Sequence, residues 1–138
     1  MAIAQSLCSS FKTEILLGVH DLDTDVLKIA LYTSAANLGA ATTVYTTTDE
    51  VVGTGYVAGG NTLTGATVSL DGTTAVVTFD NTSWSASITA RGALIYNSSK
   101  SDKAIAVLDF GSDKTSSSGV FPITFPPATA GSAIIQVA

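Results

Sequence analysis

Four glycines crowd into residues 50–60, which read EVVGTGYVAGG. A glycine-rich loop binds the pyrophosphate of a dinucleotide when a strand ends at the glycines and a helix begins directly after them. Here the third glycine falls one position late, and the sequel NTLTGATVSL is rich in hydroxyl and β-branched residues without a helical period. We therefore expect a turn that bends the backbone for a close approach, anchored by Tyr56, and no nucleotide site.

The sequence DLDTD at 21–25 places oxygen ligands at alternate positions, as the start of a calcium loop does. That loop also needs glycine at its sixth position and glutamate at its twelfth, where this chain has Val26 and Tyr32. We expect instead a loop that caps the preceding helix and leaves its carboxylates in solvent.

The sequence contains few residues suited to nucleophilic catalysis or to binding a transition metal. His20 and Cys8 are the only histidine and the only cysteine, and one helix would hold them about 18 Å apart. Four carboxylates remain as candidates for glycoside hydrolysis, but no spacing selects a pair among Asp49, Glu50, Asp80 and Asp109. We expect a protein that is not an enzyme and has no catalytic residue, cofactor or metal site.

Aromatic residues offer one further site. Carbohydrate-binding sandwiches stack sugars on exposed rings, and the candidates here are Trp84, Tyr32, Tyr45, Tyr56 and Tyr96. The alternative, which we favour, is that these rings fill the core and its turns.

Charge is scarce in this chain. Only 12% of the residues are charged, whereas 46% are hydrophobic, and 20 threonines and 16 serines supply much of the polarity. Small neutral side chains need little desolvation when two proteins meet, which favours a subunit of an assembly over a monomer that is merely threonine-rich. A net charge of −5 without a basic stripe excludes a nucleic-acid surface. Short apolar runs predict no membrane span, and the amino terminus does not resemble a secretory signal.

A length of 138 residues is that of one domain, so we expect a single domain over residues 1–138. Apolar residues recur at a spacing of four from Ile3 to Val19, and Leu16 widens their stripe, which predicts an amphipathic helix within 1–20. We expect Gly18, or the HDLDTD segment that follows, to end this helix. We expect the apolar face of this helix either to pack on the sheet of its own subunit or to dock on a neighbouring subunit.

The period changes to two in VLKIALYT at 26–33, and turn signals then recur every eight to twelve residues. They include a hairpin at Asp71-Gly72 and the polar turn SSKSD at 98–102. Pro122 marks its strand as an edge. The expected fold is all-β, an antiparallel β-sandwich or jelly-roll-like barrel over 26–138 after the amino-terminal helix.

Several blocks resemble a family of small virion structural proteins of tailed bacteriophages. They are AIAQSLCSSFKTEILLGVHD, DVLKIALYTSAANLGAATTVYTTTDEVVGTGYVAGGNTLTG, ITARGALIYNSS, AVLDFGSDKTS and AIIQVA. The resemblance implies a non-enzymatic virion protein, assembled in the host cytoplasm, that best fits a capsid decoration, or cement, protein. Such a protein bridges major capsid proteins and forms a homo-oligomer, for which we favour a trimer. A tail, neck or baseplate subunit is the main alternative, and a carbohydrate-binding module is a lesser one.

For contacts between subunits the sequence offers two apolar segments and the glycine-rich turn. The expected contact residues are Leu7, Phe11 and Ile15 of the helix, Tyr56 of the turn, and Ile134, Ile135 and Val137 of the last strand. Each could equally belong to the core of its own chain.

Overall fold

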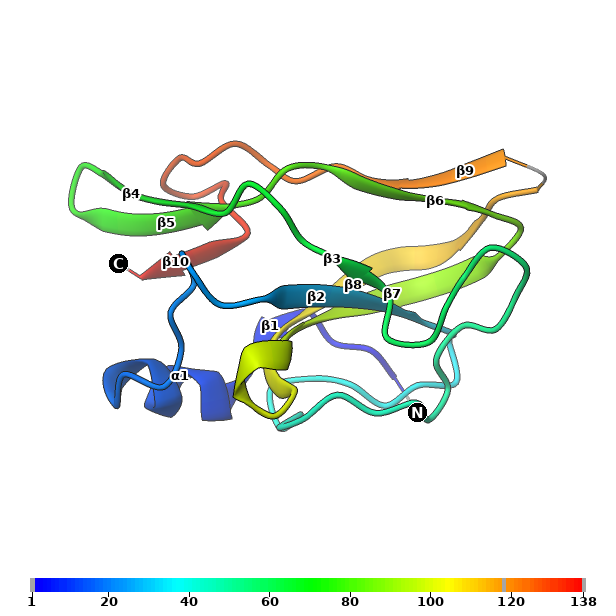
Figure 1. Cartoon of the computed structure of the whole chain (residues 1–138), viewed down its shortest axis with the longest axis horizontal. Helices are drawn as coiled ribbons and strands as arrows, with labels where there is room; N and C mark the ends of the chain where they lie inside the picture. Colours follow the sequence, from blue (N-terminus) through cyan, green and yellow to red (C-terminus); the bar gives the residue numbers. More distant parts are fainter. Residues whose placement is uncertain (1, 118, 138) are drawn as a thin grey trace.

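A five-stranded antiparallel sheet forms the centre of the molecule (Figure 1). In this computed structural model, which describes residues 2–117 and 119–137, the strands follow the order β1-β8-β7-β2-β3. Their bounds are β1 Ser6–Leu7, β8 Lys103–Thr115, β7 Thr89–Asn97, β2 Leu27–Tyr32 and β3 Asn61–Thr62. The polar turn predicted at 98–102 joins β7 to β8 and begins with the short helix η1, Ser98–Lys100.

A second layer covers one face of this sheet and is split into two parts (Figure 1). One part has the order β10-β5-β4, with β10 Ile135–Val137, β5 Thr74–Thr78 and β4 Thr67–Asp71. The other pairs β6, Thr82–Ala86, with β9, Gly119–Ile123. The two layers confirm an antiparallel β-sandwich, and its sheets end in open edges rather than closing into a barrel.

The opposite face of the central sheet is covered as well. Helix α1, Ser9–Leu16, and the loop 33–48 lie below it in Figure 1. Strand β2 therefore alternates as predicted, but side chains on both of its sides are buried: Ile29 and Leu31 toward one face, Ala30 and Tyr32 toward the other. This double burial gives a chain of modest length a continuous apolar core.

The predicted amino-terminal helix exists, but the predicted position of its start is wrong. Helix α1 begins at Ser9 rather than near residue 2, because Leu7 pairs with Ala106 of β8 and Ile3 forms a bridge with Leu38. A spacing of four residues keeps side chains on one face of a strand as well as of a helix, so the apolar pattern could not separate the two. Gly18, at φ 73°, follows the end of the helix as predicted.

Two turn predictions can be compared directly with the structure. The hairpin between β4 and β5 turns at Gly72-Thr73, one residue later than predicted, and Asp71 and Thr74 close it. Pro122 lies in β9 opposite Ser83 of β6, and β9 has no second neighbour among the described strands. The prediction of an edge strand near the carboxyl end is confirmed.

Cys8 lies directly before α1 and is fully buried. Its backbone N–H donates to the Ile105 carbonyl over 2.9 Å. Burial, followed by the negative charge of Glu14, raises the pKa of the Cys8 thiol from 9.0 to about 11. Because the thiolate is the reactive form, this thiol is held in its unreactive form.

We predict that Cys8 of the native protein reacts with Ellman's reagent at pH 8 at least about 100-fold more slowly than in urea, since two pKa units reduce the thiolate fraction by that factor. A Ser112→Cys variant supplies the control, because residue 112 is exposed and its thiol should react at once. Equal rates for the two thiols would contradict the burial of Cys8. Since the folded pKa lies above the unfolded one, this group also lowers the free energy of unfolding as pH rises from about 9 to 11.

Candidate functional site

The glycine-rich stretch folds around a buried carboxylate. Glu50 is 6% exposed, and its Oε1 accepts a hydrogen bond of 2.5 Å from the Tyr45 hydroxyl. Its Oε2 accepts bonds of 2.5 Å from the Tyr56 hydroxyl and 2.8 Å from the Gly59 N–H. All three donors lie within nine residues of Glu50, so one side chain fixes the path of the whole loop.

This loop covers the outer edge of β2. The Val51 N–H donates to the Leu31 carbonyl over 3.0 Å, and the Leu31 N–H donates to the Tyr56 hydroxyl oxygen over 2.9 Å. The hydroxyl thus takes the place that a carbonyl of a neighbouring strand would occupy, while its own proton goes to Glu50. Backbone groups that would be open at a sheet edge are satisfied here within the chain.

Two of the glycines are required by close contact. A Cβ at Gly60 would lie 1.8 Å from the carbonyl oxygen of Ile29, and one at Gly55 would lie 2.1 Å from that of Ser85. Both glycines also have positive φ, +76° and +91°. The prediction of a bending turn with a close approach is confirmed, and the approached strands, β2 and β6, belong to the same chain.

The phenols around Glu50 are kept in their protonated, donating form. Burial, with the hydrogen bond to Glu50 next, raises the pKa of Tyr45 and of Tyr56 well above the usual range. Burial, followed by the charges of Asp102 and Glu50, raises the pKa of Tyr96 to about 12. Tyr96 stacks on Tyr45 at a ring distance of 4.6 Å and donates to the Gly59 carbonyl over 2.6 Å. The Glu50 carboxylate and the side chains of Tyr45, Tyr56 and Tyr96 thus form one continuous network.

A second polar network joins α1 to the far end of β7. The fully buried His20 side chain bonds Glu14 Oε1 through Nε2 at 2.9 Å and Asn97 Nδ2 through Nδ1 at 3.0 Å. The Asn97 carbonyl oxygen accepts from the Ser99 N–H, so its amide group donates both to His20 and to Asp25 Oδ2, the latter over 2.8 Å. Nδ1 must therefore accept, which assigns the proton to Nε2.

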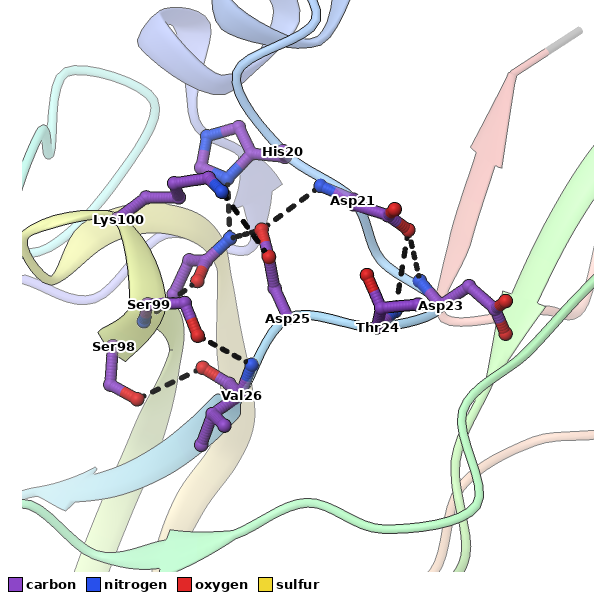
Figure 2. Close-up of polar contacts among 10 residues, drawn as sticks. His20, Asp21, Asp23, Thr24, Asp25, Val26, Ser98, Ser99 and Lys100 are labelled. Carbon is purple, nitrogen blue, oxygen red and sulfur yellow. Dashed lines mark hydrogen bonds and ion pairs between the residues drawn. The ribbon is translucent and has the colours of Figure 1, made fainter.

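The acidic loop 21–25 is tied together mostly by its own backbone (Figure 2). Asp21 Oδ1 accepts from the N–H groups of Asp23 and Thr24, and Asp25 Oδ2 accepts from the Asp21 N–H. Hydrogen bonds lower the pKa of both carboxyls. The largest contribution comes from Thr24 for Asp21 and from Asn97 for Asp25. Lys100 Nζ lies 3.3 Å from Asp25 Oδ1. The expected solvation holds for the exposed Asp23 but not for Asp25, which the protein itself surrounds.

Neither network has the composition of a metal centre. Among residues 2–117 and 119–137, no group of three or more His, Cys, Asp or Glu side chains is placed to hold a metal ion. The expected distance between Cys8 and His20 rested on a shared helix, and that premise is wrong because Cys8 precedes α1 and His20 follows it. His20 bonds Glu14, while Cys8 Sγ faces the Gly39 carbonyl at 4.0 Å.

The residues predicted as subunit contacts do not form one surface. Three of them lie in the core of their own chain: Phe11, Tyr56 and Ile135. Three are partly buried and pack against that core: Leu7, Ile15 and Ile134. Only Val137 is largely exposed, at 52%. The amphipathic pattern was wrong for Leu16, which was expected on the apolar stripe and is 88% exposed.

An open apolar groove of about 570 Å³ separates β8 from β9. Its apolar lining includes Leu108, Phe110, Phe121, Ile123, Phe125 and Ile134, and one residue of each charge, Asp109 and Lys114, also lines it. Consecutive residues of both strands line it, and on their outer sides β9 has no strand partner and β8 has one only at Ala106 and Val107 among the described strands. No sequence signal revealed it, because it depends on how far apart the two layers lie.

The aromatic residues fill the interior rather than forming a sugar platform. Trp84 is 4% exposed and packs against Tyr56 and Phe121, at ring distances of 5.9 and 6.4 Å. Tyr32 and Tyr96 are buried, and Tyr45 is half-buried against Tyr96. The expectation of core packing is confirmed for these rings.

Comparison with models of protein families, with curated proteins and with solved structures found no match for this chain. In the described part of the chain, no helix combines the length and the apolar character needed to cross a membrane.

We predict that Glu50→Ala lowers the free energy of unfolding by about 3 kcal/mol or more, because it leaves three buried or half-buried donors without their acceptor. Glu50→Gln keeps one carbonyl oxygen for Tyr56 and Gly59 and should cost only about 1 kcal/mol. Urea unfolding measures both, with the exposed Asp113→Ala as the control. A Glu50→Ala variant as stable as this control would contradict the assigned role.

Asn97→Ala should cost about 2–4 kcal/mol, because His20 Nδ1, the Asp25 carboxylate and the Ser99 N–H each lose a bond. The matched variant is Asn37→Ala, at an exposed asparagine, which should change stability by less than about 0.5 kcal/mol. Thermal unfolding of the two variants side by side makes the comparison. If both lose equally little, the network does not stabilise the fold.

Proposed function

We propose that this protein is a non-enzymatic structural subunit of a tailed-bacteriophage virion, and that it acts as a capsid decoration protein. In this role it bridges and stabilises neighbouring major capsid proteins and associates with further copies of itself. The resemblance of its sequence blocks to virion structural proteins supports the phage context. The structure supports a role in binding other proteins.

The groove between β8 and β9 is the observation that carries the proposal. It combines an apolar lining with the free edge of β9 and with the part of β8 beyond Val107, where β1 no longer pairs with it, and this combination suits an extended segment of a partner protein. Backbone pairing along an edge supplies affinity that does not depend on the partner's exact sequence, while the apolar pockets select its side chains. We assign this groove to a strand of the major capsid protein.

The sparse charge fits the same role. A shell protein contacts its partners at many equivalent sites, so weak contacts at each copy add up through multivalency. With only 6 basic and 11 acidic residues in the chain, few charges must be desolvated when such contacts form. Exposed apolar residues such as Val120 at the groove, 58% exposed, provide burial instead.

Quantitative mass spectrometry of purified virions tests the proposal. We predict a copy number comparable with that of the major capsid protein, and recovery of the protein with capsids rather than with tail fragments. Only a few copies, recovered with tails, would contradict the capsid role and favour the tail, neck or baseplate alternative.

The groove can be tested with a pair of variants. Val120→Asp places a charge in the apolar groove and should lower occupancy on particles at least tenfold. Val57→Asp changes another exposed valine, 76% exposed, that does not line the groove, and this variant should bind as the unchanged protein does. Equal occupancy for both variants would remove the groove from the proposal.

A further inference from the structure

Strand β4 is an edge strand without a cover. All five of its residues, Thr67–Asp71, are exposed, and β5 is its only neighbour in the described sheet. The loop 50–60 covers the edge of β2, whereas no described strand pairs with the outer edge of β4. An open edge is a template for pairing with another chain.

Two apolar side chains of β4 lie on the same face of the sheet as core residues, but they are exposed to solvent. Val68 lies in register with Val77 of β5 and Ile135 of β10, and the latter two are buried in the core. Residues two positions along share that face, so Leu70, Ala75 and Val137 form the next row. In this row Leu70 is 73% and Val137 is 52% exposed. Core-facing apolar side chains are thus left in solvent at this end of the layer.

The hairpin turn determines which backbone groups of β4 are free. A two-residue hairpin loop is closed by a hydrogen-bonded pair, here Asp71 and Thr74. Hydrogen-bonded pairs alternate along the ladder, so Thr67, Ser69 and Asp71 direct their N–H and C=O groups toward β5. Val68 and Leu70 direct theirs outward, along the open edge.

We propose that β4 pairs antiparallel with β4 of a second copy of this chain, about a two-fold axis through Ser69. Val68 then lies opposite Leu70 of the second copy, and their outward groups exchange both N–H···O bonds, as do the symmetry-related groups. Val68 and Leu70 of one copy then pack beside Leu70 and Val68 of the other, which removes these apolar side chains from solvent. Three strands from each copy form one continuous sheet.

Charge agrees with this register. Asp71, the charged residue of β4, lies opposite Thr67 of the second copy, so no two carboxylates face one another. Ser69 faces Ser69 of the second copy at the axis. The strand is therefore complementary to itself in backbone, apolar and charged groups.

This inference deepens the proposed function and rests on its self-association, since it names the contact between copies. It predicts a two-fold dimer as the basic unit in place of the trimer expected from the sequence. A ring or shell contact through the groove uses other elements and remains compatible with it.

Disulfide trapping tests the register. Ser69→Cys puts two thiols at a non-hydrogen-bonded pair, where the Cα atoms are about 4.5 Å apart, within the range of a disulfide. Thr67→Cys is the matched control, since its two copies lie about 14 Å apart along the strands. Both positions are exposed, and the buried Cys8 should not compete. We expect Ser69→Cys, and not Thr67→Cys, to form a covalent dimer on mild oxidation.

Light scattering of the unchanged protein over a dilution series gives a second readout. We expect a species of twice the 14.0 kDa chain mass, which Leu70→Glu converts to monomer and Val52→Glu, at a 95% exposed control position, does not. A monomer or trimer of the unchanged protein, or equal cross-linking of the two cysteine variants, would overturn the pairing. A dimer that is missing from virions would refute the proposed function alone. Abundant virion copies without Ser69→Cys cross-links would refute the pairing alone.

Discussion

A strand at the edge of a sheet exposes backbone donors and acceptors that must be covered by the chain or paired with another one. The central sheet meets this constraint at β2 by an unusual route. The loop 50–60 returns along the strand, and the Tyr56 hydroxyl accepts the Leu31 N–H in place of a strand carbonyl. The buried Glu50 carboxylate holds that hydroxyl and the rest of the loop, so the closed edge depends on one side chain.

A similar device operates where β7 ends. Asn97 gathers His20, Asp25 and the Ser99 N–H, and thereby joins the segment after α1 to the turn that leads into β8. In both places a buried polar side chain satisfies several groups at once, which makes it costly to remove and specific in geometry. Helix α1 is short, and the network at its carboxyl side helps to fix it against the sheet. The apolar core supplies the driving force, while these two residues determine how the connecting segments run over it.

Local patterns in the sequence were enough to predict the fold class. The alternation in β2, the turn at 98–102 and the edge position of Pro122 follow from period and turn chemistry. The helix start was wrong because a spacing of four suits both a helix and a strand, and only β8 decides that Leu7 pairs as a strand. The sequence offers Glu50 only as one of four candidate carboxylates for glycoside hydrolysis, because the partners that define its role come together only when the loop is folded. The groove and the open β4 edge depend on the placement of distant strands and left no local signal.

Native amide hydrogen exchange, measured at several protein concentrations, tests the contrast between a closed and an open edge most directly. The account predicts that the Leu31 amide is protected at every concentration, because its acceptor belongs to the same chain. The Leu70 amide should exchange freely in dilute protein and become protected only as copies pair. A Leu31 amide that exchanges like an open loop, or a Leu70 rate that is independent of concentration, would contradict it.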